Sequence, residues 1–121
     1  MALTKEQLAF RKKWLAALRS GEYEQATGEL RDAVGFCCLG VACDISGVGK
    51  WEGPNYYPRR GMSRRHFPPY HVATLFGIDE ELENALSELN DADRPGFIGE
   101  SADFLEIADT IELLTLADME S

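Results

Sequence analysis

Apolar side chains recur at the spacing of a helix near the start of this 121-residue chain. Thr4 and Gln7 form a capping-box pattern, which is typical of the first turn of a helix. The apolar stripe that follows runs to about Arg19, and Gly21 stands where a helix is expected to end. The pattern predicts an amphipathic helix over residues 5–19.

A second apolar segment, residues 36–46, contains three cysteines and a glycine. Because glycine lowers the stability of a helix by about 1 kcal/mol relative to alanine, Gly40 indicates that another element approaches closely. Gly47 follows at a position where the end of a helix favours a positive φ. The residues at i, i+3, i+4 and i+7 spacing, which predict one buried helical face, are Phe36, Leu39, Gly40 and Cys43.

Three more helices are predicted in the second half of the chain. One begins at the proline pair 68–69 and ends at Gly77, since proline suits the first position of a helix and glycine its C-terminal cap. An acidic helix follows over residues 79–89, and a turn-rich connection comes after it. Asp103 and Glu106 form a capping pattern that predicts a last helix.

Between these helices the composition changes. Residues 47–68 are rich in glycine, proline and aromatic residues, and a connection of this length in a compact domain is often functional. Residues 29–31 fit either a short strand or an extended arm. We therefore expect a mainly α fold (α+β with at most a small hairpin), as a compact single domain over residues 1–121 with a long loop or insert at 47–68.

The charge is divided unevenly along the chain. The net charge is −9, yet residues 1–78 carry 11 Lys and Arg against 7 Asp and Glu, whereas residues 79–121 carry 14 acids and a single Arg. Such asymmetry suggests two surfaces with opposite preferences. Duplex DNA is an unfavourable partner, because most of the surface would repel phosphate.

Length and composition place the chain among globular proteins. With 45% hydrophobic residues it can bury a core without disulfides. Residues 1–6 lack the apolar region of a secretion signal, and no apolar run reaches the roughly 18 residues of a membrane span, so we expect no membrane partner. Three cysteines cannot all pair, and we expect reduced, buried thiols in a cytosol.

Two sets of residues resemble a known family. The first comprises Trp14, Ala17, Leu18, Arg19, Ser20, Gly21, Tyr23, Gln25, Gly28, Leu30 and Arg31, followed by the run FCCLGV at residues 36–41. The second comprises Leu89, Asn90, Asp91, Phe104, Glu106, Ile107, Ala108, Asp109, Ile111 and Glu112. Together they resemble a family of small proteins encoded by bacteriophages and prophages. The resemblance implies a phage gene whose product acts in the cytoplasm of a bacterial host, and it implies no particular reaction.

No acidic residue lies between Glu52 and Asp79, and basic and aromatic side chains are concentrated in and beside this segment. Guanidinium groups bind phosphate oxygens in pairs, and aromatic rings stack on nucleobases. The combination predicts a pocket for a phosphate-bearing small molecule such as a nucleotide. An alternative is that the arginines pair with the acidic half of the chain, within one molecule or across a dimer, while the rings pack the loop down. The candidate residues are Trp51, Tyr56, Tyr57, Arg59, Arg60, Arg64, Arg65 and His66.

Polar residues in the connections that carry the family resemblance are further candidates. Their donors and acceptors can line a small-molecule site, or they can tie loops to backbone groups, as Asn and Asp do in turns. The residues are Tyr23, Gln25, Asn90 and Asp91.

The cysteines and histidines match no zinc pattern, since adjacent cysteines on a helix point about 100° apart. A catalytic cysteine with a histidine base is disfavoured as well, because nothing in an apolar helix lowers the pKa of a thiol. We expect no metal site and no cofactor. The residues concerned are Cys37, Cys38, Cys43, His66 and His71.

Carboxylates recur at helical spacing in the last third of the chain, as on a solvated helix face. They also allow a second function, in which helical carboxylates imitate the phosphates of a nucleic acid and occupy a basic groove on a bacterial host protein. These residues are Glu80, Glu81, Glu83, Glu88, Asp103, Glu106, Asp109 and Glu112.

The sequence thus predicts a binding protein and not an enzyme, since it shows neither a paired nucleophile and base nor a metal set. We expect it to sequester a phosphate-bearing small molecule, such as a nucleotide signal of bacterial defence, as a phage counter-defence protein. Homo-oligomerisation would bring arginines of two chains around one ligand. The alternative is the acidic inhibitor that docks on a host protein.

Overall fold

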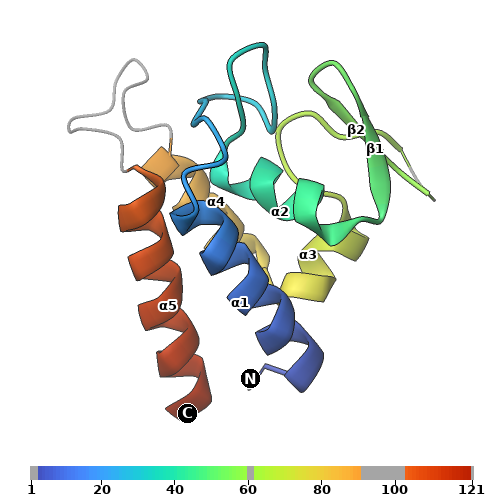
Figure 1. Cartoon of the computed structure of the whole chain (residues 1–121). Coiled ribbons are helices and arrows are strands. Elements are labelled where there is room, and N and C mark those ends of the chain that lie inside the picture. The colour runs from blue at the N-terminus through green and yellow to red at the C-terminus, as the bar shows by residue number, and fades with distance from the viewer. Residues whose placement is uncertain (1–2, 60–61, 91–102, 121) are drawn as a thin grey trace.

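The computed structural model describes residues 3–59, 62–90 and 103–120. Within these ranges it contains five helices and one two-stranded antiparallel sheet (Figure 1). The prediction of a mainly α fold with a small hairpin is confirmed. The elements in chain order are α1 (Lys5–Arg19), α2 (Cys38–Ser46), β1 (Gly49–Glu52), β2 (Asn55–Pro58), α3 (Tyr70–Phe76), α4 (Glu80–Asn90) and α5 (Phe104–Glu120).

Helix α1 lies at the centre of the helical arrangement. It contacts α2, α3 and α5, and it runs alongside α5 in Figure 1. The hairpin of β1 and β2 lies beside α2 on the other side of the molecule. One buried apolar cluster receives side chains from all five helices and from β2, and its largest fully buried members include Trp14, Leu39, Tyr56, Phe76, Leu86 and Ile107.

The helix ends follow the capping chemistry that the sequence indicates. The Thr4 N–H donates to Gln7 Oε1 at 2.9 Å and the Gln7 N–H donates to Thr4 Oγ1 at 3.1 Å, so the predicted capping box of α1 is confirmed. Gly77 ends α3 with φ +64°, and the Glu106 N–H donates to Asp103 Oδ1 at the start of α5. Each predicted helix exists: α1 has the predicted bounds, and ends of the others differ by one or two residues.

Helix α2 starts two residues later than predicted. Phe36 is extended and forms isolated β-bridges with Gln25 and Arg31, so its backbone is not available to a helix. Cys37 is therefore the N-cap, and its Sγ accepts a hydrogen bond from the Gly40 N–H at 3.3 Å. Residues 29 and 30 are bends and Arg31 forms the bridge to Phe36, so the short strand considered for residues 29–31 is not formed, and we call these three residues the arm.

Part of the predicted long loop is regular structure. Residues 49–58 pair as the hairpin, with Gly49 opposite Pro58 and Glu52 opposite Asn55. Gly53 adopts φ +58° in the turn between the strands. The hairpin thereby orients the aromatic and basic residues that the sequence singles out.

Gly40 marks the close approach that its position predicts. A Cβ atom at this position would overlap the carbonyl oxygen of Leu30 and lie 2.7 Å from its carbonyl carbon. The arm at residues 29–31 therefore crosses α2 in direct backbone contact. Among the helices that the described residues form, none has the length and apolar character required to cross a membrane.

Replacing Gly40 with alanine tests this contact. Helix propensity alone would stabilise α2 by about 1 kcal/mol, whereas overlap with the Leu30 backbone is expected to destabilise the protein by about 1–3 kcal/mol. Urea unfolding measures the difference. Ala9→Gly, on an exposed position of α1, calibrates propensity and should cost about 1 kcal/mol. A gain in stability for Gly40→Ala would contradict the contact.

Candidate functional site

The hairpin places the aromatic candidates of the predicted phosphate pocket on two opposite faces. Successive residues of a strand point to opposite sides, and the register places Trp51 opposite Tyr56 and Lys50 opposite Tyr57. Trp51 and Tyr56 face inward: Tyr56 is 1% exposed, whereas Tyr57 is 42% exposed on the outward face. Tyr56 therefore has no open face for a ligand, and the hairpin ring available for stacking is that of Tyr57.

The inward face completes a row of edge-to-face aromatic contacts. Ring centroids are 5.2 Å apart for Tyr23 and Phe36, 5.6 Å for Phe36 and Trp51, and 4.9 Å for Trp51 and Tyr56. The guanidinium of Arg31 lies 5.7 Å from the centre of the Phe36 ring and 5.5 Å from that of Trp51. Such geometry is typical of stabilising aromatic and cation–π contacts.

Asp44 joins two rings of this row through one carboxylate. Tyr23 donates its hydroxyl proton to Oδ2 at 2.6 Å, and the indole N–H of Trp51 donates to Oδ1 at 3.1 Å. Burial, and then the hydrogen bond to Asp44, raises the pKa of Tyr23 well above its usual value. Burial also raises the pKa of Tyr56, against the opposing effect of its hydrogen bond with Ser46. Tyr23 and Trp51 thus hold the connection and the hairpin to the end of α2.

The arginines of the predicted phosphate pocket have different surroundings. Arg65 donates from Nε and Nη2 to Oε1 of Glu29, at 3.1 and 2.8 Å, so this guanidinium is paired within the chain. The backbone of Arg64 exchanges two hydrogen bonds with Tyr56, at 2.7 and 2.9 Å. Arg60 lies outside the described residues.

The positive charge of Arg64 affects the pKa of a carboxyl group on α4. Burial raises the pKa of Glu83, Glu80 raises it further, and Arg64 opposes the shift.

Arg59 lines two hollows at the base of the hairpin, and we call them together the Arg59 hollow. One has a volume of about 460 Å³ and is lined by Val48, Pro58, Arg59 and His71. The other has a volume of about 340 Å³ and is lined by Gly47, Gly49, Lys50, Tyr57, Pro58 and Arg59. None of these described lining residues is acidic. Within the described ranges, no carboxylate lies at ion-pair distance from Arg59 or Lys50.

A further hollow, which we call the His66 hollow, has a volume of about 400 Å³ and lies where four segments meet. It contains two predicted site residues, His66 and Asn90. Asn90 is fully buried: its Oδ1 accepts from Gln25 Nε2 and from the Cys38 N–H, and its Nδ2 donates to the Ala26 carbonyl. The lining residues are Thr27, Gly28, Glu29, Cys37, Cys38, Leu39, His66, Phe67, Ser87 and Asn90.

Gln25 and Asn90 therefore tie the chain together, as the structural alternative for such residues predicts. Asp91 lies outside the described residues. The three cysteines are buried, and the pKa of Cys43 is raised, chiefly by burial. Among the described residues, no group of three or more His, Cys, Asp or Glu side chains is placed to hold a metal ion.

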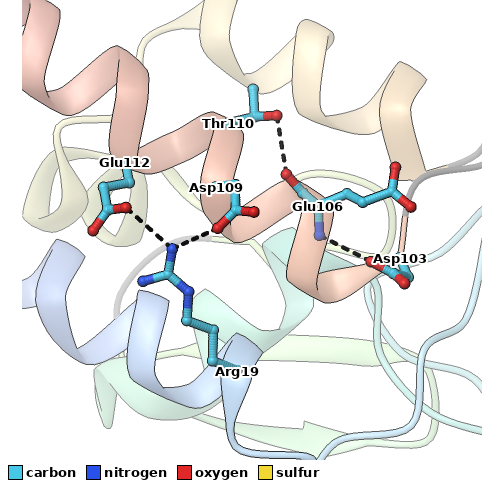
Figure 2. Close-up of polar contacts among 6 residues, drawn as sticks. All are labelled: Arg19, Asp103, Glu106, Asp109, Thr110 and Glu112. Atoms are coloured by element: carbon cyan, nitrogen blue, oxygen red, sulfur yellow. Dashed lines mark hydrogen bonds and ion pairs between the residues drawn. The ribbon is translucent and has the colours of Figure 1, made fainter.

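Among the described side chains, Arg19 joins α1 to α5 by ion pairs. Figure 2 shows Arg19 of α1 between two carboxylates of α5: its Nη2 lies 2.8 Å from Asp109 Oδ1 and 3.3 Å from Glu112 Oε2. Burial is slight here, and the hydrogen bonds to Asp109 and then Glu112 raise the pKa of Arg19. Both carboxylate side chains keep more than half of their surface exposed, at 72% and 52%.

Sequence reasoning did not identify several of the polar groups that shape these sites. Asp44 and Glu29 are the partners of Trp51 and Arg65, and Lys50 adjoins Arg59. The alternation of the hairpin could have revealed Lys50, which lies opposite Tyr57 on the outward face. No local sequence pattern indicates Glu29 as a partner, because Arg65 lies 36 residues away along the chain and the two meet only in the folded structure.

The chain belongs to the family described as a domain of unknown function, DUF8296, whose model matches residues 6–68. The matched residues extend from α1 through the hairpin to the segment that follows it. No curated protein and no solved structure matches the chain.

Removing the Tyr23 hydroxyl tests the Asp44 junction. We expect Tyr23→Phe to lower the free energy of unfolding by about 1 kcal/mol at neutral pH, because Asp44 loses a hydrogen-bond donor. Tyr70→Phe, at a tyrosine that is 83% exposed, is the matched control and should have no effect. Equal stability of the two variants in urea unfolding would contradict the junction.

The same variant has a signature at high pH. An unfolded tyrosine loses its proton near pH 10, about its usual pKa, whereas folded Tyr23 keeps it because its pKa is raised. The contribution of Tyr23 is thus complete below the unfolded pKa and is lost as the pH rises toward the folded value. The free energy of unfolding, measured in urea at several pH values across this range, should decrease less steeply with pH for Tyr23→Phe than for the wild type.

Proposed function

We propose that this protein binds a phosphate-bearing small molecule, such as a nucleotide, without turning it over. The observation that carries the proposal is the Arg59 hollow: Arg59 lines both of its parts, Lys50 joins it in one and His71 in the other, and the described lining residues of both include no acid. A guanidinium presents paired donors to phosphate oxygens, and an ammonium adds a second positive charge.

The neighbouring groups suit the remainder of such a ligand. Tyr57 is half-exposed on the outward face beside Lys50, so its ring can support a base. Glu52, the one acid of the hairpin, lies at the turn end opposite Asn55 and does not line the hollow. Gly47 has open space where a Cβ atom would lie, so its backbone allows close approach.

Capture without chemistry accords with a protein that sequesters a signal. In a phage-encoded protein acting in the bacterial cytoplasm, removal of a nucleotide signal of host defence would serve as counter-defence. Tight binding is sufficient for that role. A second copy of the chain, contributing cations to the same ligand, would increase the affinity.

Calorimetry with a mononucleotide, a dinucleotide and a cyclic dinucleotide tests the proposal. We expect Arg59→Gln to weaken binding about tenfold or more, because a charge-assisted hydrogen bond contributes about 1.5–3 kcal/mol. Arg65→Gln is the matched control: its guanidinium is already paired with Glu29, so binding should change little. Affinity should also fall with added salt.

The proposal fails if no phosphate-bearing probe binds, or if Arg59→Gln binds as well as the wild type. An equal loss for Arg65→Gln would also contradict the Arg59 hollow, because Arg65 does not line it.

A specific observation supports a second candidate, an acidic inhibitor that docks on a basic groove of a bacterial host protein. Glu81 of α4, Asp79 just before this helix, and apolar residues of α5 such as Leu114 line one hollow of about 330 Å³. The outer side of α5 adds exposed leucines to exposed carboxylates, and Leu113 is 68% exposed. Apolar anchors within a charged surface are typical of binding faces.

Neutralising three carboxylates separates this candidate from the first. We expect the combined change Glu81→Gln, Asp109→Asn and Glu112→Gln to abolish capture of a host protein from lysate, while Arg59→Gln retains it. The exposed pairs with Arg19 contribute little to stability, and circular dichroism checks that the variant is folded. Capture that survives the triple change would exclude the acidic surface.

A further inference from the structure

The His66 hollow has a wall chemistry different from that of the Arg59 hollow, and the two share no lining residue. Its volume of about 400 Å³ is in the range of small-molecule sites. Glu29 is the one charged side chain among its described lining residues, and Arg65 balances that charge. The hollow is therefore close to neutral and unsuited to a phosphate.

Glu29 contributes an acceptor to this wall. Both hydrogen bonds from Arg65 end on Oε1, at 3.1 and 2.8 Å. Within the described parts of the chain, Oε2 receives no hydrogen bond from the protein. A carboxylate oxygen accepts up to two further bonds, so Oε2 is available to a ligand with N–H donors.

His66 contributes a second acceptor. Its Nδ1 lies 2.9 Å from the carbonyl oxygen of Gly28. A carbonyl can only accept, so Nδ1 carries the proton, and Nε2 of the neutral ring then carries the lone pair. Among the described residues Nε2 has no hydrogen-bond partner. The bond to Gly28 thus orients the ring and determines which nitrogen can accept.

The rest of the wall suits a flat, uncharged molecule. Phe67 is 37% exposed and supplies an aromatic ring, while Leu39 adds an aliphatic surface. Ser87 and Thr27 bring hydroxyl groups from α4 and from the connection before α2. Apolar walls with a few oriented polar groups are typical of sites for heterocycles.

We propose that the His66 hollow binds an uncharged planar heterocycle that carries adjacent N–H donors, as on the N1–H and 2-amino edge of guanine. The donor edge bonds to Glu29 Oε2 and His66 Nε2, and the ring packs on Phe67. The site is independent of phosphate capture at Arg59, and it requires no charge on the ligand.

Guanosine is the probe, because it presents the donor edge and has no phosphate. We expect saturable binding by calorimetry and ligand-observed NMR, and binding of inosine, which lacks the 2-amino group, that is about tenfold weaker or more. Guanosine that does not saturate the protein, or inosine that binds equally well, overturns the proposal.

Variants of the two acceptors test the assignment of groups. Glu29→Gln should weaken guanosine binding about tenfold or more, because it removes the charged acceptor. Glu24→Gln makes the same charge change on an exposed residue that does not line the hollow, and it should bind as the wild type does. Equal affinities for these two variants overturn the role of Glu29.

His66→Asn is designed to keep the bond to Gly28, since the asparagine amide nitrogen occupies the place of Nδ1, while the counterpart of Nε2 is lost. We expect guanosine to bind several-fold more weakly, and unchanged affinity overturns the role of Nε2. Arg59→Gln should leave guanosine binding unchanged. Failure of phosphate capture and failure of this site are therefore separate results.

Discussion

The contact between Leu30 and Gly40 is the constraint on which the two sides of this molecule depend. Leu30 is fully buried, its carbonyl accepts from the Cys37 N–H at 3.1 Å, and its N–H donates to the Arg65 carbonyl at 2.7 Å. One residue thus joins the arm, the start of α2 and the segment after the hairpin. Because the backbone itself makes the approach, only a residue without Cβ fits opposite it.

This crossing separates the acid-free segment into parts with different surroundings. The arm brings Glu29 against Arg65 and Gly28 against His66, whereas Arg59 remains at the base of the hairpin, away from the arm. The alternation of the strands then places Tyr56 in the core and packs Trp51 against the core. Residues of the same type therefore have different partners and exposures once the chain has folded.

Helices and their ends were predictable because their signals are local. The capping box at Thr4 and the positive φ of Gly77 need only neighbours within one turn. Phe36 was misplaced in a helix because its bridges to Gln25 and Arg31 depend on tertiary pairing. The same reason hides Glu29 and Asp44 as partners, since each bonds with a side chain that the fold brings from elsewhere.

The chemistry of each hollow follows from which side chains the fold adds to the acid-free segment. At Arg59 it adds Lys50 and His71, so positive charge accumulates without compensation among the described residues. At His66 it adds Glu29, which cancels the charge of Arg65 and leaves acceptors in place of cations. One arginine-rich segment can thus contribute to a site for anions and to another for neutral donors. A guanidinium with a carboxylate beside it is neutralised, whereas one without such a neighbour keeps its positive charge available to a ligand.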